Sequence, residues 1–255
     1  MIFESHAHYD DDAFDGDREE LLLSMKEAGV GFIINVGASI RTTEQTIALT
    51  EKYPFIYGAA GVHPSETAEL DEEKYEWLKK QCALPKIVAV GEIGLDYYWE
   101  EPAHDIQKKW FERQLLLAKE VALPVIIHSR DAAKDTLDMM KALHAGEQGG
   151  VIHCFSYAKE MAREYLDMGY YFGIGGVVTF QNAKKLQEAA AYIPLENILL
   201  ETDSPYLAPV PNRGKRNSSK NLPFVAQKIA EIKGISYEEV VSVTEQNAKR
   251  LFFRE

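Results

Sequence analysis

The amino-terminal stretch Met1-Ile2-Phe3-Glu4-Ser5-His6-Ala7-His8 joins a short apolar run to a His-x-His pair. In an extended strand, residues two apart point to the same side, so the two imidazoles would lie about 6–7 Å apart along one face. Neutral imidazole is the commonest metal ligand among side chains. Taken alone, the pair is also compatible with two hydrogen-bonded polar residues at a strand end. The stretch predicts a strand that ends in candidate metal ligands.

The same arrangement, an apolar run followed by a ligand-type side chain, recurs along the chain. Runs rich in Ile, Val and Gly alternate with amphipathic segments, as expected for parallel strands that helices cover on both faces. The predicted strands are Met1–Ser5, Gly31–Val36, Phe55–Val62, Lys86–Gly91, Pro124–Ile127, Gly150–Ile152, Tyr170–Gly175 and Asn197–Glu201. The predicted helices are Asp17–Ala28, Arg41–Tyr53, Asp71–Gln81, Ala103–Val121, Ala132–Ala145, Lys159–Met168, Ala183–Tyr192, Pro223–Lys233 and Ser236–Phe252.

Eight strand–helix units in 255 residues predict a (β/α)8 TIM barrel, with the last helices capping it. A doubly wound open sheet is the alternative, but it would not gather residues from so many strands around one point. No Ser/Gly linker, repeat or low-complexity run divides the chain. We therefore expect residues 1–255 to form a single domain.

Composition limits the classes of protein. Apolar residues make up 46% and charged residues 27%, which is ordinary for a globular protein. No apolar run approaches the ~18 residues of a membrane span, and the start lacks the pattern of a signal peptide. Cys82 and Cys154 stand alone, which argues against a disulfide framework or a thiolate zinc site. We expect a cytoplasmic protein without a membrane partner or an obligate protein partner.

The histidines are unevenly distributed. Of the seven, five stand at or just past the carboxyl end of a predicted strand: His6, His8, His63, His128 and His153. His104 and His144 fall on predicted helices, whereas Glu92 and Asp203 likewise close the apolar runs before them. In a (β/α)8 barrel all these ends meet on the face where barrel enzymes place their active sites. A single such residue is explained as a polar side chain entering a loop, but the set predicts one common site.

The donor types restrict the metal. Four imidazoles and two carboxylates, without a thiolate, suit Zn²⁺, Mn²⁺ or Mg²⁺. Six protein ligands are too many for one catalytic ion, and suit two divalent ions that share a carboxylate about 3.5–4 Å apart. Two such ions would outweigh the two carboxylates and leave the pocket positive inside a chain of net charge −12. That charge excludes a surface coated in basic residues, so we expect local attraction of a phosphate substrate.

Six segments resemble the TatD-type metal-dependent deoxyribonucleases. They are Glu4–His8, Gly61–Pro64, Gly91–Asp96, Ile127–Arg130, Ile152–Ser156 and Leu200–Leu207. The similarity extends in order to Arg213–Asn217 and Asn247–Phe252. It implies a barrel of the metal-dependent hydrolase type, a dinuclear site and hydrolysis of DNA phosphodiesters, often from the 3′ end.

The resemblance also implies roles for individual residues. His6, His8 and Asp203 would hold one ion, His128 and His153 the other, with Glu92 as the bridge. His63 would contact substrate phosphate. Two features depart from the family. The first is Glu4, which replaces the usual Asp, and we expect this change behind the ligands to be harmless. The Asn-x-Pro after the basic loop is displaced to Asn221-Leu222-Pro223, which leaves the contact residues of that loop open.

The chemistry of such a site follows from its donors. Metal binding lowers the pKa of a water from 15.7 towards ~7, which supplies hydroxide near neutral pH. We expect Asp203 to orient that water and take its proton, and Glu92 and His63 to be the other catalytic residues. His63 and Arg130 would offset charge on the phosphoryl oxygens, although Arg130 could instead pair with Asp131. The run Tyr97–Trp99 would stack bases or form a hydrophobic lid.

A basic loop follows the last ligand. Residues 212–220 carry Arg213, Lys215, Arg216 and Lys220 in a chain that is otherwise acidic. We expect Lys215 and Arg216 to bind substrate as a rim that tracks phosphates on the barrel face. The alternative is a solvated loop.

The sequence therefore predicts a divalent-metal-dependent deoxyribonuclease that acts as a 3′-to-5′ exonuclease on single-stranded DNA or 3′ ends. The alternative is a carboxyl-ester or C–N hydrolase on the same scaffold, such as an aminoacyl-tRNA deacylase. Many amidohydrolases use a carboxylated Lys as the bridging ligand, whereas the equivalent strand here ends in Glu92, which favours phosphoesters. A non-catalytic metal-binding scaffold is a third possibility that six ligands disfavour.

Overall fold

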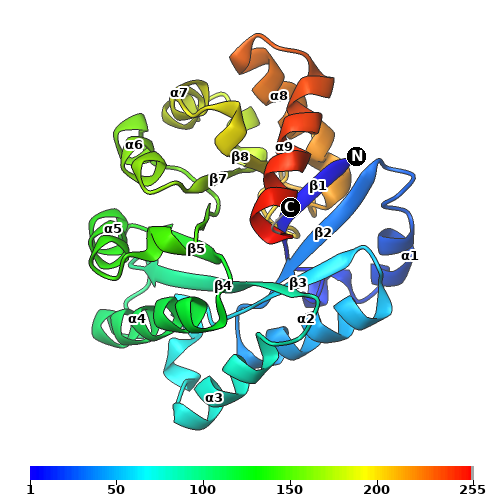
Figure 1. Ribbon diagram of the computed structural model, residues 1–255. Coiled ribbons are helices and arrows are strands. Elements are labelled where there is room, and N and C mark those ends of the chain that lie inside the picture. The colour runs from blue at the N-terminus through cyan, green and yellow to red at the C-terminus, as the bar shows by residue number, and fades with distance from the viewer. Residues whose placement is uncertain (254–255) are drawn as a thin grey trace.

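A computed structural model describes residues 1–253 and shows one sheet of eight parallel strands in sequential order (Figure 1). The strands are β1 Ile2–Ala7, β2 Val30–Val36, β3 Ile56–Ala60, β4 Ile87–Asp96, β5 Val125–Arg130, β6 Gly150–Ile152, β7 Tyr171–Ile174 and β8 Ile198–Leu200. Each strand pairs in parallel with the next one. The sequential order of the strands around the ring confirms the predicted (β/α)8 barrel.

The ring closes between β1 and the chain just past β8. The amide of Asp203 donates to the carbonyl of His6 at 3.0 Å, and the amide of His8 donates to the carbonyl of Ser204 at 2.8 Å. The Ser5 hydroxyl donates to the Leu200 carbonyl. Barrel closure itself therefore brings Asp203 beside the His-x-His pair, although about 195 residues separate them in sequence.

Within residues 1–253, nine α-helices surround the sheet (Figure 1). They are α1 Arg18–Leu23, α2 Ile40–Lys52, α3 Glu72–Gln81, α4 His104–Val121, α5 Ala133–Ala142, α6 Lys159–Asp167, α7 Lys184–Tyr192, α8 Leu222–Lys233 and α9 Tyr237–Phe252. Short 3₁₀ helices occupy Asp12–Phe14, Pro64–Glu69, Ala145–Glu147, Gly176–Thr179, Leu195–Asn197 and Ser219–Asn221.

Two helices end earlier than predicted. Helix α1 stops at Leu23 rather than Ala28, because the Ser24 hydroxyl bonds back to the Leu21 carbonyl and the chain continues in turns. Helix α5 stops at Ala142, so His144 lies in a left-handed turn and not on a helix.

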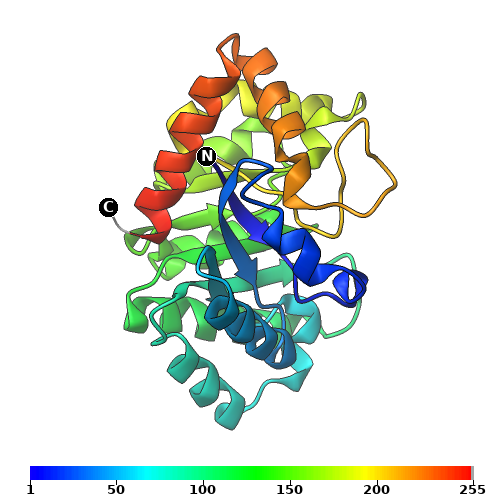
Figure 2. The same cartoon turned by 90° about the vertical axis from the view of Figure 1, so that its right-hand side faces the viewer.

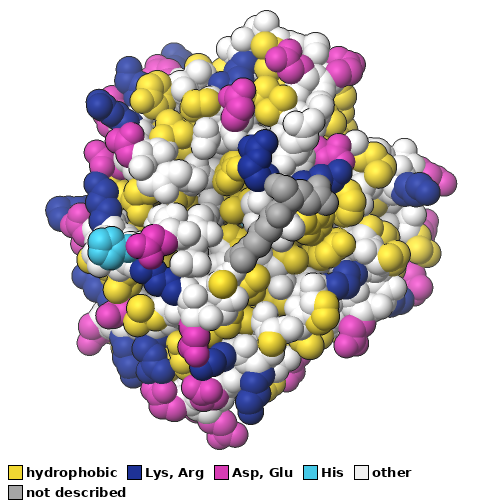
Figure 3. Space-filling model, in the orientation of Figure 1, with side chains coloured by type: hydrophobic (Ala, Val, Ile, Leu, Met, Phe, Trp, Pro, Cys, Tyr) yellow, Lys and Arg dark blue, Asp and Glu magenta, His cyan; other side chains and the backbone are white. Residues whose placement is uncertain are grey.

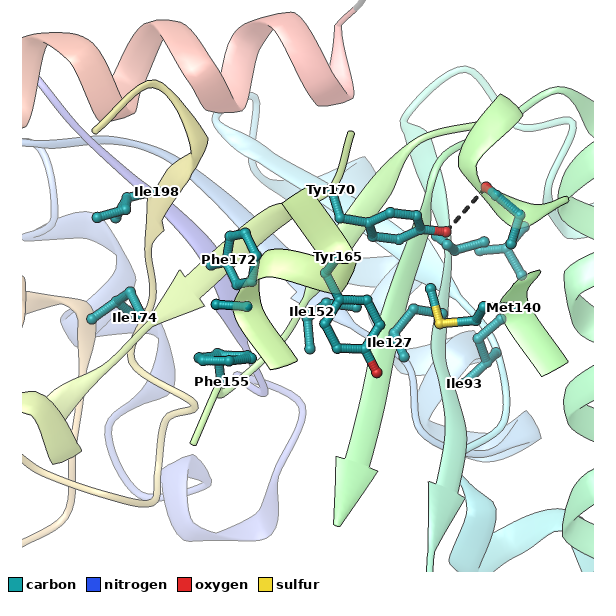
Figure 4. Close-up of a cluster of buried hydrophobic side chains, with 14 of the residues drawn as sticks. Ile93, Ile127, Met140, Ile152, Phe155, Tyr165, Tyr170, Phe172, Ile174 and Ile198 are labelled. Atoms are coloured by element: carbon teal, nitrogen blue, oxygen red, sulfur yellow. Dashed lines mark hydrogen bonds between the residues drawn. The ribbon is translucent and has the colours of Figure 1, made fainter. Parts of the chain in front are cut away.

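The barrel interior is apolar at its amino-terminal end. Phe3, Ile34, Val88 and Leu199 meet there, and the last turns of α9 pack Ala248, Leu251 and Phe252 against them. A second layer fills the space between the strands and the outer helices, including Tyr165, Tyr170 and Phe172 (Figure 4). Because both faces of the sheet are buried, polar side chains gather at the carboxyl ends of the strands.

Strands β4 and β5 run further than predicted, to Asp96 and Arg130. Gly94 pairs with His128 and Asp96 pairs with Arg130 across the two strands. The prediction ended these two strands directly before their first polar residues, Glu92 and His128. In the structure the backbone stays paired beyond these residues, while the polar side chains face the barrel mouth. Glu92 and His128 are consequently held by rigid strands rather than by loops.

Three further observations concern the helices, the charge on one face and the position of two loop segments. None of the helices in residues 1–253 is long and apolar enough to span a bilayer. On the face shown in Figure 3, acidic and basic side chains are interspersed and do not form one basic patch. Figure 2 shows the loop of residues 203–221 and the segment of residues 9–17 on the side of the barrel opposite the last turn of α9.

Candidate metal centre

A cleft of about 780 Å³ opens at the carboxyl ends of the strands. The predicted site residues that line it are His8, His63, Glu92, His128, Arg130, His153 and Asp203. His6 lies beneath them and is fully buried. The fold therefore brings together all six predicted metal ligands, together with His63 and Arg130.

The first group consists of His6, His8 and Asp203. Nε2 of His6 lies 3.1 Å from Nε2 of His8, and His8 Nε2 lies 3.4 Å from Oδ1 of Asp203. Two donors that each bind one ion at about 2.1 Å stand roughly 3.0–3.4 Å apart. Nδ1 of His8 faces the Val36 carbonyl at 2.9 Å, so a neutral His8 ring carries its proton on Nδ1 and offers the Nε2 lone pair. The group fits a divalent ion.

Glu92 lies between this group and a second one. Its Oε2 is 3.4 Å from His6 Nε2 and 3.8 Å from His8 Nε2. Its Oε1 is 2.7 Å from His128 Nδ1 and 3.6 Å from His153 Nε2. The two oxygens of one carboxylate thus face two separate sets of imidazoles, which is the arrangement that a shared ligand requires.

His63 is oriented differently from these imidazoles. The Ser65 amide donates to His63 Nδ1 at 3.1 Å, so a neutral ring carries its proton on Nε2. Burial, together with the neighbouring His128, lowers the pKa of His63 to about 3. Its Nε2 lies 4.0 Å from Glu92 Oε1. A neutral ring that presents N–H to the cleft suits a hydrogen bond to a substrate oxygen better than metal ligation.

Charge in the cluster favours a bound cation. Burial would raise the pKa values of Glu92 and Asp203, but the surrounding imidazoles hold both below their ordinary values. Burial would lower the pKa values of His8 and His153. The neighbouring carboxylates outweigh this effect and raise the pKa of His8 to about 9 and that of His153 to about 10. Imidazoles and carboxylates that stabilise each other's charged forms are a donor set that a divalent cation would bind in place of protons.

Two acidic residues were missed by the sequence prediction. Oδ2 of Asp96 lies 3.1 Å from His128 Nε2, and Oε1 of Glu201 lies 3.1 Å from His153 Nδ1. Both could have been found from spacing: Glu201 stands two residues before Asp203, and Asp96 four residues after Glu92.

The predicted positive excess in the pocket is wrong. Five carboxylates line the cleft: Asp10, Asp11, Glu92, Asp96 and Asp203. Two divalent ions together with Arg130 would only balance these carboxylates, so we expect the ions themselves and Arg130 to attract phosphate at close range.

Arg130 stacks on an aromatic ring. Its guanidinium carbon lies 3.7 Å from the centre of the Tyr98 ring, and residues 1–253 contain no ion pair between Arg130 and Asp131. Trp99 also lines the cleft and is 55% exposed. Tyr97 instead donates its hydroxyl to Asp135, which removes it from the proposed base-stacking run. The stack leaves the Arg130 N–H groups free to reach an anion in the cleft.

The basic loop is arranged differently from the prediction. Arg216 donates to the Asp17 carboxylate and the Ala13 carbonyl, each at 2.7 Å, and does not line the cleft. It ties the loop to the segment before α1 and is not free for phosphate. Lys215 is also outside the cleft lining, but it is exposed and has no ion pair within the described residues. Asn217 anchors the loop by donating to the Thr202 and Tyr206 carbonyls.

Several known proteins are similar to this chain over nearly its whole length. The family model described as TatD related DNase matches residues 3–253. The chain belongs to the TatD family. A Bacillus subtilis metal-dependent hydrolase, YabD, is 45% identical over 99% of both chains. The Citrobacter rodentium protein named 3′-5′ ssDNA/RNA exonuclease TatD is 33% identical over 92% of both chains. The crystal structure of the Escherichia coli TatD homologue YjjV superposes with a TM-score of 0.93 at 32% identity, covering 99% and 98% of the two chains.

These similarities confirm the family that the sequence motifs indicated, and with it a metal-dependent hydrolase. Glu4, which we expected to be harmless behind the ligands, has a structural role. It is fully buried and accepts hydrogen bonds from the amides of His6 and Thr202 and the hydroxyls of Thr202 and Ser219. Burial raises the pKa of Glu4 to about 8, although the hydrogen bonds oppose the shift. Glu4 thus joins β1 to the chain on either side of Asp203.

Replacing Glu4 by Ala is expected to lower the free energy of unfolding of this TatD protein by about 3 kcal/mol or more, because two buried amides lose their acceptor at about 1–3 kcal/mol each. Urea denaturation of the metal-free protein measures the change. Glu4→Gln keeps one acceptor oxygen and should recover most of the loss, and the exposed Glu19→Ala is the control. A Glu4→Ala variant within 1 kcal/mol of wild type would contradict this role.

Proposed function

We propose that the chain is a divalent-metal-dependent phosphodiesterase that removes nucleotides from the 3′ end of single-stranded DNA at a dinuclear site. The observation that carries the proposal is Glu92, whose two oxygens face separate imidazole groups. His6, His8 and Asp203 would hold one ion and His128 and His153 the other. The donor set suits Mg²⁺, Mn²⁺ or Zn²⁺.

Divalent ions in such a site lower the pKa of a coordinated water and polarise a phosphoryl oxygen. The chain's own residues supply the rest. The Asp203 carboxylate, 18% exposed at the cleft, is placed to accept a proton from the attacking water. His63 presents an N–H to the cleft, and Arg130 presents a guanidinium already held against Tyr98. Both suit non-bridging phosphate oxygens, where negative charge builds during hydrolysis.

Support for a nucleic-acid substrate comes from two sources. One relative, from Citrobacter rodentium, is named as a 3′-5′ exonuclease of single-stranded DNA and RNA. Trp99, exposed at the edge of the cleft, offers a face on which an unpaired base can stack. Such stacking contributes about 1–3 kcal/mol per base and does not depend on sequence.

An end-labelling assay tests the proposal. A single-stranded DNA oligonucleotide labelled at its 3′ end should release labelled mononucleotide at once, whereas the 5′-labelled strand should shorten stepwise. The matching duplex, RNA, bis-p-nitrophenyl phosphate and aminoacyl-tRNA are compared by kcat/KM under the same metal. Deacylation of aminoacyl-tRNA without cleavage of DNA would replace this function by an esterase. Release of internal fragments would contradict exonuclease action.

The basic loop gives a prediction of its own. The double variant Lys215→Ala/Lys220→Ala should raise KM for single-stranded DNA and flatten its dependence on log salt by about 1.4 units, at about 0.7 per lost phosphate contact. Arg216→Ala should leave that slope unchanged, because Asp17 already holds the guanidinium. The matched control is Lys26→Ala/Lys80→Ala, in segments that precede β2 and β4 at the other end of the barrel. A double variant with the wild-type slope would show that these lysines do not contact the strand.

A further inference from the structure

Glu201 is a buried carboxylate that the proposed chemistry does not use. It follows β8 directly and is 1% exposed. Oε1 accepts a hydrogen bond from the Cys154 amide at 2.6 Å and lies 3.1 Å from His153 Nδ1. Within residues 1–253, neither Oε2 nor His153 Nδ1 has a hydrogen-bond partner, so Oε1 and Nδ1 are in contact without hydrogen-bond geometry. A buried carboxylate with one unpaired oxygen is costly unless positive charge lies nearby, so its position calls for an explanation.

The neighbouring strand leaves space for this carboxylate. A Cβ atom placed on Gly173, in β7, would lie 1.9 Å from Oε2 of Glu201 and 2.4 Å from its Cδ. Any side chain at this position would therefore displace the carboxylate. Two residues on, a Cβ on Gly175 would lie 3.7 Å from Glu201 Cγ, which is an ordinary contact. Because Gly173 has no side chain, the space beside it is free for the Glu201 carboxylate.

The Glu201 carboxylate lies beside one nitrogen of His153, with Oε1 3.1 Å from Nδ1. A carboxylate oxygen only accepts, so the proton on the near side of the imidazole belongs on Nδ1. Nε2 then offers its lone pair on the opposite side, 3.6 Å from Glu92 Oε1 and 3.8 Å from Asp203 Oδ1. The ring also stacks on His6 with centroids 3.5 Å apart, which fixes its plane.

We propose that Glu201 is a positioning residue that fixes the tautomer and orientation of His153, so that Nε2 faces the second metal ion. This inference rests on the dinuclear site of the proposed function. A second ion would also keep positive charge near the Glu201 carboxylate when the His153 ring is neutral. Removing a carboxylate that orients a histidine ligand weakens metal affinity by roughly 10–100-fold.

The test measures metal binding directly, by titrating metal-free protein with Mn²⁺ in a calorimeter. Glu201→Ala should weaken binding of the second ion by roughly 10–100-fold and change the first ion less. Glu201→Gln keeps an oxygen for His153 Nδ1 and the Cys154 amide, so it should recover most of that affinity. Gly173→Ala should reproduce Glu201→Ala without touching a ligand, and Gly175→Ala should bind both ions like wild type.

Activity gives a second readout. The kcat/KM of Glu201→Ala on bis-p-nitrophenyl phosphate should recover when the Mn²⁺ concentration is raised, which a loss of folding would not show. Wild-type affinity for both ions in Glu201→Ala would overturn the positioning role, even if the variant melted at a lower temperature. If Gly173→Ala does not fold, the two Glu201 variants decide the question. If wild type itself binds one ion, the dinuclear proposal fails, and the role of Glu201 stands only if Glu201→Ala still weakens that ion.

Discussion

Replacing Glu92 by Ala is expected to release or loosen both divalent ions and to lower kcat/KM by about 10²–10³-fold or more, because the ions contribute several kcal/mol of charge stabilisation. The reason is geometric: Oε2 lies 3.4 Å from His6 and Oε1 lies 2.7 Å from His128, so one side chain serves both groups. Elemental analysis by mass spectrometry of the metal-loaded variant, beside phosphodiesterase activity, measures the effect.

His128→Ala is the matched comparison for Glu92→Ala. The two ring nitrogens of His128 face Oε1 of Glu92 and the Asp96 carboxylate, away from the His6–His8 group, so its loss should affect mainly one ion. Two ions retained in Glu92→Ala would exclude the carboxylate as a shared ligand. A fully loaded wild-type protein that contains at most one ion would reject the dinuclear arrangement altogether.

The fold prediction depended mainly on the strand pattern, because buried parallel strands appear in the sequence as apolar runs. All eight strands were predicted in the order that the structure shows. The ends of the strands could not be placed in the same way. Polar residues at a barrel mouth resemble the start of a loop, although Glu92 and His128 lie within paired strands. The sequence located these residues at the carboxyl ends of the strands, but the predicted strands β4 and β5 were shorter than the observed ones.

Tertiary pairing explains what the sequence did not reveal at the site. Arg216 was expected to contact substrate, but its partner Asp17 lies 199 residues away in the chain. Spacing could have suggested Asp96 and Glu201 as site residues, but only the folded barrel shows that they face His128 and His153. The Tyr98 stack of Arg130 is a further example, because the sequence left contact with phosphate and pairing with Asp131 as equal alternatives. Local patterns predict ligand types, but long-range packing selects their partners.

The number of carboxylates in the cleft leads us to expect that bound metal favours phosphate binding. Asp10, Asp11 and Asp96 add negative charge to the two carboxylates of the predicted ligand set. Without metal, Arg130 and the protonated forms of His8 and His153 would offset only part of this charge. We therefore expect metal loading to strengthen substrate binding, and chelation to weaken substrate binding as well as turnover.

Asp203→Asn is expected to lower kcat by a factor on the order of 10² or more, because an amide cannot take the proton of the attacking water. The fold should survive. Asp203 has a φ of 58°, a left-handed conformation that Asn adopts more readily than most residues. The surrounding histidines hold the pKa of Asp203 below its ordinary value despite burial, so wild type is ionised at neutral pH. Steady-state kinetics under saturating metal measures the loss.

Saturating metal separates two roles of Asp203, because its Oδ1 lies 3.4 Å from His8 Nε2 within the first ion's group. If Asp203 only held that ion, excess metal would restore kcat. If it also accepts the proton, kcat stays low with both ions bound. Asp131→Asn is the matched control, since Asp131 is exposed and has a φ of 54° but does not line the cleft. Wild-type kcat in Asp203→Asn at saturating metal would remove Asp203 from proton transfer and leave it a ligand alone.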